Sequence, residues 1–153
     1  MIKTKNELSF YIAADRIMNG YRPKRNLIDR LKETLAIGGA NTIVIKYLRH
    51  LRKYAYYYNT RNQSVLHMIM AVYEHYQLAK YALKTGMTIG QNALSYGVVI
   101  PHYGTIVINE KAKIGPFAVI HTSTCVAGGG QISRRGILSF FRLSTGWRND
   151  IGR

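Results

Sequence analysis

The residues able to carry chemistry are few in this chain of 153 residues. They include five histidines and one cysteine, Cys125. A single cysteine excludes an internal disulfide and a four-cysteine metal site, and no histidine pair has the spacing of metal ligands, so no metal is expected. Among the histidines, His102 belongs to the most distinctive stretch of the chain, and a neutral imidazole can accept a proton from a hydroxyl near neutral pH. That stretch is Ile100-Pro101-His102-Tyr103-Gly104-Thr105-Ile106-Val107-Ile108-Asn109.

The charges are strongly unbalanced. Lysine and arginine number 22 against 7 aspartate and glutamate residues, which gives a formal net charge of +15 with the histidines neutral. The excess indicates an anionic partner, and charge alone leaves open whether this is nucleic acid, a membrane surface or a phosphorylated small molecule. The single cysteine indicates a reducing compartment. No signal peptide and no run of about 20 apolar residues is found, so a cytoplasmic protein is expected.

The elements that position His102 are predicted from the spacing of apolar residues, which follows two different periods along the chain. In residues 1–85 this spacing is that of helices. We expect four helices, at residues 7–19, 23–36, 41–58 and 63–85. Pro23 is expected in a first turn, and helix ends are expected at Gly20, Gly38-Gly39 and Gly86. The fourth helix carries little polar surface and is predicted to be the most buried of the set.

The third helix is predicted to have one apolar and one basic face. Its apolar positions recur three or four apart: Ile43, Tyr47, Leu48, Leu51, Tyr54, Ala55 and Tyr58. The basic face is expected to carry Lys46, Arg49, His50, Arg52 and Lys53.

After Gly86 the period changes to six. Ile108, Ile114, Ile120 and Val126 are evenly spaced and are expected to point inward. A sustained period of six fits neither a helix nor a flat strand; it predicts short strands joined by tight turns, as in a hexapeptide β-helix. The register slips between residues 89 and 108, so an insertion or bulge is expected there, where a side chain can be turned out of a regular wall.

Three segments after Gly86 carry a family resemblance. They are the Ile100–Asn109 stretch, Ala112-Lys113-Ile114-Gly115 and Val126-Ala127-Gly128-Gly129-Gly130. They resemble the hexapeptide-repeat acyltransferases, specifically the serine O-acetyltransferases. Upstream, Tyr11-Ile12-Ala13-Ala14-Asp15-Arg16-Ile17 is similar to short members of that family, so the resemblance covers roughly residues 5–132.

The resemblance and the two periods together predict an α+β chain. Residues 1–85 would form a helical domain, residues 86–132 a short left-handed parallel β-helix, and residues 133–153 an irregular basic tail. The resemblance implies a homotrimer with active sites between neighbouring subunits. It also implies acetyl-CoA as donor and the hydroxyl of L-serine as acceptor, the reaction that forms O-acetylserine in cysteine biosynthesis; the acceptor stays open, since related enzymes acetylate sugars and other amines.

The resemblance also implies roles for individual residues. His102 matches the general base, while Asp15, Tyr103 and Gly104 match the substrate side. Gly128, Gly129, Gly130 and Arg134 are expected near acetyl-CoA, the glycines as oxyanion donors and the arginine at the phosphates. Neither nucleic acid nor a membrane is expected as a partner of this enzyme.

The chain departs from the family pattern at two places. Pro101, rather than an aspartate, precedes His102, and Met87 or Thr88 occupies the position of the carboxylate that orients the base. The six-residue period is lost after Gly130, where family members continue with further repeats, so a truncated or altered C-terminus is expected. An inactive acyltransferase is therefore one alternative. The other is a non-enzymatic basic module that binds nucleic acid or a protein partner through Lys46, Arg49, Arg52 and Lys53.

Overall fold

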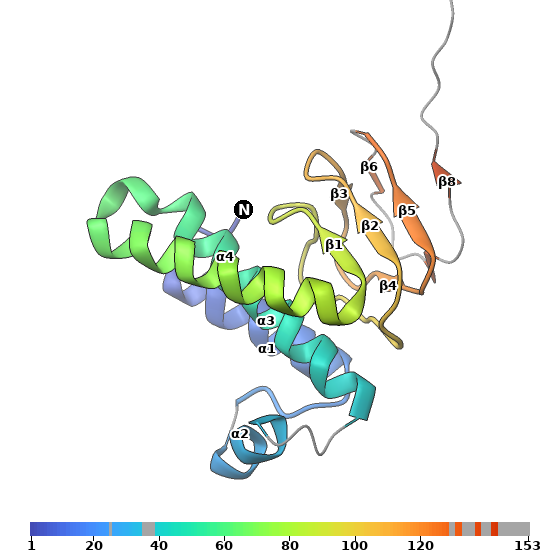
Figure 1. Ribbon diagram of the computed structural model, residues 1–153, viewed down its shortest axis with the longest axis horizontal. Coiled ribbons are helices and arrows are strands. Elements are labelled where there is room, and N and C mark those ends of the chain that lie inside the picture. The colour runs from blue at the N-terminus through green and yellow to red at the C-terminus, as the bar shows by residue number, and fades with distance from the viewer. Residues whose placement is uncertain (25, 35–38, 129–130, 133–136, 139–141, 144–153) are drawn as a thin grey trace, which may run out of the picture.

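Four α-helices precede all the strands in the computed structural model (Figure 1). It describes residues 1–24, 26–34, 39–128, 131–132, 137–138 and 142–143. The helices are α1 (Lys5–Met18), α2 (Leu27–Thr34), α3 (Gly39–Asn59) and α4 (Val65–Thr85), and a short 3-10 turn, η1 (Arg61–Gln63), joins the last two. The four predicted helices are confirmed, with ends that move by up to four residues.

Capping side chains explain the shifted helix starts. The Thr4 hydroxyl accepts from the Glu7 amide at 3.1 Å, and the Glu7 carboxylate accepts from the Thr4 amide at 3.0 Å. This reciprocal cap begins α1 two residues earlier than expected. Asn26 and Asp29 cap α2 in the same way, at 2.7 and 3.2 Å, so the prediction that Pro23 lies in a first turn was wrong.

The helix ends predicted at glycine residues are confirmed in part. Gly86 ends α4 with a positive φ of 70°, and its amide donates to the Ala82 carbonyl at 2.8 Å. Gly20 follows α1 with a φ of 81°. Gly39, however, begins α3 instead of ending a helix, and Gly38 lies outside the described residues.

The strands are short and entirely parallel. They are β1 (Met87–Ile89), β2 (Ile106–Ile108), β3 (Lys113–Ile114), β4 (Val119–Ile120), β5 (Thr124–Val126), β6 (Gln131–Ile132), β7 (Ile137–Leu138) and β8 (Arg142–Leu143). They form one sheet in the order β1-β2-β5-β8 and two pairs, β3-β6 and β4-β7. Helices followed by a parallel sheet confirm the α+β prediction.

The register shows where the regular spacing breaks. Ile106 pairs with Thr124 and Val99 with Val119. The chain therefore takes seven residues from Val99 to Ile106 but only five over the paired segment from Val119 to Thr124. The slip expected between residues 89 and 108 is confirmed, and the two extra residues fall in the loop that carries His102.

One core joins the helices to the strands. It contains the six-spaced residues Ile108, Ile114, Ile120 and Val126, all buried as predicted. Leu48 and Leu51 of α3 and Leu78 of α4 pack into the same cluster. The Tyr47 hydroxyl of α3 accepts from the Ile89 amide of β1 at 3.1 Å. Helical and strand regions thus share buried surface.

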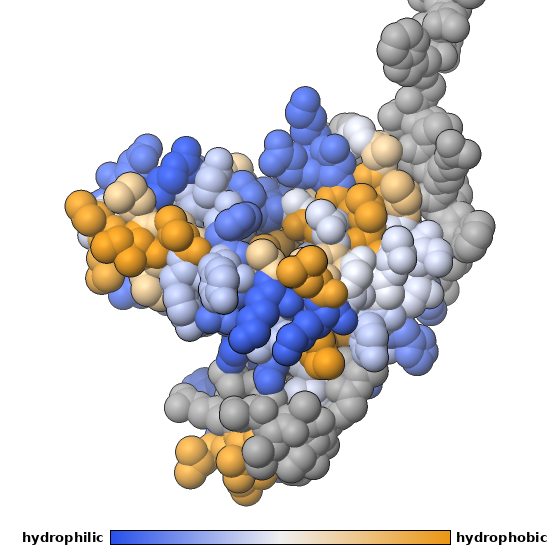
Figure 2. Space-filling view, viewed as in Figure 1, coloured by the Kyte–Doolittle hydropathy of each residue, from blue (hydrophilic) through white to orange (hydrophobic). Residues whose placement is uncertain are grey.

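The predicted burial of the third and fourth helices needs correction. In α3 the apolar positions Tyr47, Leu48, Leu51 and Ala55 are buried as expected, but His50 and Arg52 of the basic face are buried as well. In α4 only Ala71, Glu74, Leu78 and Thr85 are buried. The prediction that α4 is the most buried helix was wrong, because it packs on α3 with one face and leaves the other uncovered. Apolar surface gathers where η1 leads into α4 (Figure 2).

Candidate active site

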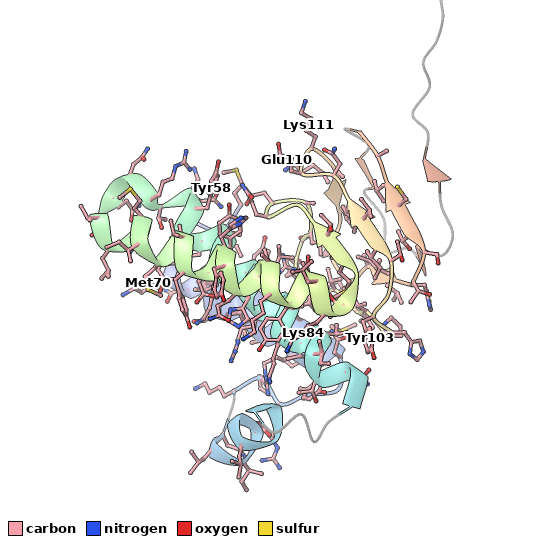
Figure 3. The ribbon with its side chains drawn as sticks, in the orientation of Figure 1. Tyr58, Met70, Lys84, Tyr103, Glu110 and Lys111 are labelled. Carbon is pink, nitrogen blue, oxygen red and sulfur yellow. The ribbon has the colours of Figure 1, made fainter. Side chains whose placement is uncertain are left out.

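The loop from Ile100 to Thr105 presents His102 at the surface. Ile100 before the histidine and Ile106 after the loop are both buried and anchor its two ends in the core. His102 and Tyr103 between them are exposed, and Tyr103 projects outward below the strands (Figure 3). The two extra residues of this loop thus form an outward bulge with an imidazole near its middle.

Two glycines allow this loop to lie close to its neighbours. A Cβ added to Gly104 would lie 2.9 Å from Cγ2 of Thr122, closer than packed atoms approach. A Cβ on Gly86, which already needs a positive φ, would lie 3.3 Å from the carbonyl carbon of Gly104. The loop is therefore packed between the end of α4 and the segment after β4.

Helix α1 holds the segment that leads into the loop. The Asn19 side chain donates to the Val98 carbonyl at 2.7 Å and accepts from the Ile100 amide at 3.3 Å. The Asp15 carboxylate accepts from the Val98 amide at 3.0 Å. Asp15 lies in the last turn of α1 and Asn19, four residues on, caps its C-terminal end, so this end of the helix fixes the backbone just before His102.

Asp15 is also half of a buried ion pair. Its side chain is 2% exposed, and Arg52 of α3, which is 1% exposed, donates to it through Nε at 2.8 Å and Nη2 at 3.3 Å. The same guanidinium donates to the carbonyls of Leu94 at 2.7 Å and Ser95 at 2.5 Å. Asp15 therefore connects α1, α3 and the strand region. In the single chain its two oxygens are already engaged, and the substrate contact implied for it stays a prediction.

The residues expected near acetyl-CoA are only partly described. Gly128 follows β5 with a φ of 79°. Gly129, Gly130 and Arg134 lie outside the described residues, as does most of the predicted tail at 133–153. Their roles stay predictions.

The described part of the chain shows no group that orients the base. Within it, His102 has no hydrogen-bond or ion-pair partner. It also holds no group of three His, Cys, Asp or Glu side chains arranged to bind a metal ion. None of its helices is long and apolar enough to cross a bilayer.

A second polar cluster lies between α3 and α4. Glu74 of α4 is fully buried; its carboxylate accepts from Lys53 at 3.0 Å and lies 2.6 Å from Nδ1 of His50. The His50 ring also stacks on Tyr81, with centroids 5.2 Å apart. Burial by itself raises the pKa of Glu74, but the hydrogen bonds from His50 and Lys53 outweigh it and hold that pKa below its ordinary value.

The sequence predicted a basic face of α3 as a binding footprint, which was wrong for Arg52, whereas His50 lies between α3 and α4. A footprint for nucleic acid needs exposed cations, whereas Arg52 is enclosed with Asp15 and Lys53 is paired with Glu74. Asn19 and Glu74 were missed altogether. The available signal for Asn19 was its spacing of four from Asp15, since both then share one side of a helix.

No family model matches the chain, and neither does any curated protein or solved structure.

Proposed function

We propose that the protein is an acetyl-CoA-dependent O-acetyltransferase, with L-serine as its acceptor and His102 as its general base. The observation that carries the proposal is the two-residue extension that turns His102 outward from an otherwise regular, closely paired segment. An exposed imidazole on a loop anchored at both ends can meet a substrate hydroxyl without rearrangement of the core.

The chemistry needs few groups. His102 removes the proton from the acceptor hydroxyl as its oxygen attacks the thioester carbonyl, and the carbon–sulfur bond then breaks. The departing sulfur takes the proton back from the imidazolium, so the acetyl group moves to oxygen and free CoA is released. No covalent bond to the enzyme is required. Tyr103 and Gly104 adjoin the base and are the substrate-side residues in this proposal.

We further propose that the strands form a short left-handed parallel β-helix and that the chain assembles as a homotrimer. It is supported by strand pairing at intervals near eighteen residues, such as Ile106 with Thr124 and Lys113 with Gln131, in three separate sheets. Because Tyr103, next to His102 in the chain, and Val107 of β2 leave apolar surface exposed, a neighbouring subunit packed there would complete the site.

The decisive experiment measures thiol release from acetyl-CoA in the presence of L-serine. We expect His102→Ala to lower kcat by a factor of about 10² to 10⁴, the usual contribution of a general base, while folding is retained. His121→Ala is the matched control, because His121 is a half-buried histidine in the segment paired with the loop, and it should retain most of the activity.

Added CoA distinguishes the alternatives. A rise in Tm with CoA, smaller with dephospho-CoA, supports a CoA site even if turnover is absent, which would indicate an inactive acyltransferase. Full kcat in His102→Ala would overturn the role of His102. Tight, salt-sensitive binding of random DNA without any CoA response would overturn the enzyme proposal as a whole.

A further inference from the structure

Among the described helices, α4 carries the most large apolar side chains that are exposed. Eight large apolar side chains of this one helix each expose half or more of their surface. They are Val65, Leu66, Met68, Ile69, Val72, Tyr73, Tyr76 and Leu83. Solvent-exposed apolar surface of this extent indicates a contact with another molecule.

These side chains follow the spacing of a coiled coil. Exposed apolar residues alternate in steps of four and three along the helix, at Val65, Ile69, Val72, Tyr76, Ala79 and Leu83. We call these six residues the outer seam. The residues buried against α3 occupy the opposite side of the helix, at Ala71, Glu74, Leu78 and Thr85. A sustained seam of this kind fits the side of another α-helix.

We propose that the outer seam of α4 binds the same seam of a second copy of this chain. Every copy carries an identical stripe, so a symmetric pairing covers both at once. The eight exposed side chains, at roughly 100 Å² each, or about half of what a buried aromatic residue covers, offer about 800 Å² when Leu66, Met68 and Tyr73, which flank the outer seam, are covered with it. One partner of a standard interface contributes about that area.

Charge favours a second copy as the occupant. A chain with a net charge of +15 repels its own copies wherever basic surfaces meet. From Val65 to Ala79, α4 carries one charged residue, Glu74, and that carboxylate is buried and paired with Lys53. Two copies can therefore meet along this stretch without bringing like charges together.

The same charge distribution disfavours a membrane surface as the occupant. Interfacial helices carry lysine and arginine along their polar side, where these residues meet anionic headgroups. In α4 the basic residues are Lys80 and Lys84, both near its C-terminal end, where Lys84 is labelled in Figure 3.

Sedimentation equilibrium of the full chain tests the proposal. At micromolar concentration the wild type is expected at an even multiple of the 17.4 kDa monomer mass, with two chains from the seam alone or six where the seam joins two of the proposed homotrimers. Val72→Lys, at a side chain 68% exposed and central in the seam, should weaken association at least tenfold with its helical circular dichroism unchanged. Leu27→Lys is the matched control, because Leu27 is equally apolar and 80% exposed but lies on α2; it should leave the association unchanged.

Crosslinking gives a second, independent readout. In a Cys125→Ser background, which removes the native exposed thiol, Val72→Cys should be joined into dimers by a short bismaleimide, whereas Leu27→Cys should not. A monomeric or purely trimeric wild type, equal effects of the two lysine substitutions, or crosslinking at Leu27 alone would each overturn the proposal. Binding to anionic vesicles that Val72→Lys abolishes, with no self-association, would overturn it in favour of a membrane. A monomeric wild type would also contradict the proposed homotrimer, whereas a trimeric one would contradict the seam alone; the role of His102 is tested separately, by turnover.

Discussion

Helices α3 and α4 are equally long, at 21 residues each, but they divide their residues between core and surface in opposite ways. α3 carries the basic residues and yet buries residues around most of its circumference, including Arg52 and His50. α4 is the more apolar of the two and leaves a whole side exposed. Their places in the fold explain this, because α3 contacts α1, α4 and the shared core, whereas α4 lies on the outside of α3 (Figure 1).

Hydropathy alone therefore does not predict which of the two helices is more deeply buried. A cation enters the core when a buried carboxylate and backbone carbonyls satisfy it, as Asp15, Leu94 and Ser95 do for Arg52. An apolar side chain stays exposed when its own chain has no further layer to cover it. Substitutions of buried and exposed residues test this difference.

Arg52→Ala should have the largest effect on stability. It leaves the Asp15 carboxylate buried without its partner, which typically lowers the free energy of unfolding by about 3 to 5 kcal/mol. Urea denaturation measures the change. Arg61→Ala is the control, since this exposed arginine only stacks on Tyr58 and donates to its carbonyl, and it should change stability by no more than about 1 kcal/mol. Equal effects of the two substitutions would contradict the buried role of Arg52.

Glu74→Gln should lower the free energy of unfolding by about 2 kcal/mol at pH 7, because the buried acceptor loses its charge while His50 and Lys53 remain. The pKa of Glu74 is lowered in the folded state. The ionised carboxylate therefore contributes fully to the free energy of unfolding above the ordinary pKa of 4.5, and this contribution is lost as the pH falls through the pKa of the folded state.

Unfolding free energies of wild type and Glu74→Gln should therefore converge as the pH is lowered below about 4.5. Glu110→Gln is the control, because Glu110 is exposed in the turn between β2 and β3 (Figure 3). A constant difference between the Glu74 variant and wild type from pH 7 to pH 3 would refute the linkage.

Asn19→Ala should lower stability by about 1 to 2 kcal/mol, since the Val98 carbonyl and the Ile100 amide lose their shared partner. If α1 positions the loop, kcat of the thiol-release reaction should fall more than KM rises. Asn62→Ala, at an exposed asparagine in η1, controls for the loss of an amide. Unchanged kcat in a destabilised Asn19 variant would restrict Asn19 to a structural role.

Leu66→Ala should have the smallest effect. Its side chain is mostly exposed on the outer side of α4, so the unfolding free energy should change by less than about 0.5 kcal/mol where the chain is monomeric. Leu51→Ala in α3, at a side chain with 0% exposure, should cost about 2 to 5 kcal/mol. Similar losses at both leucines would show that α4 is covered within its own chain.

Local patterns predicted much of the fold and one part of the site. The helices follow from spacing and capping, and the inward isoleucines from the period of six, because both depend on residues close in sequence. The slip that exposes His102 was also visible as a break in that period. Asn19 and Arg52 could not be assigned in this way, because they contact residues 79 and 42 positions away, Val98 and Leu94.

The order of helices and strands, the inward positions of the parallel region and the excess of positive charge follow from the sequence alone. Which polar groups are buried together, and which apolar side of α4 no described part of the chain covers, depend on how the elements pack. The physical reason is that period and propensity act within a few residues, whereas burial depends on which layer lies on each face. Arg52 is enclosed because α1 and the strands meet over it, and Val72 is exposed because nothing described in this chain lies beyond α4.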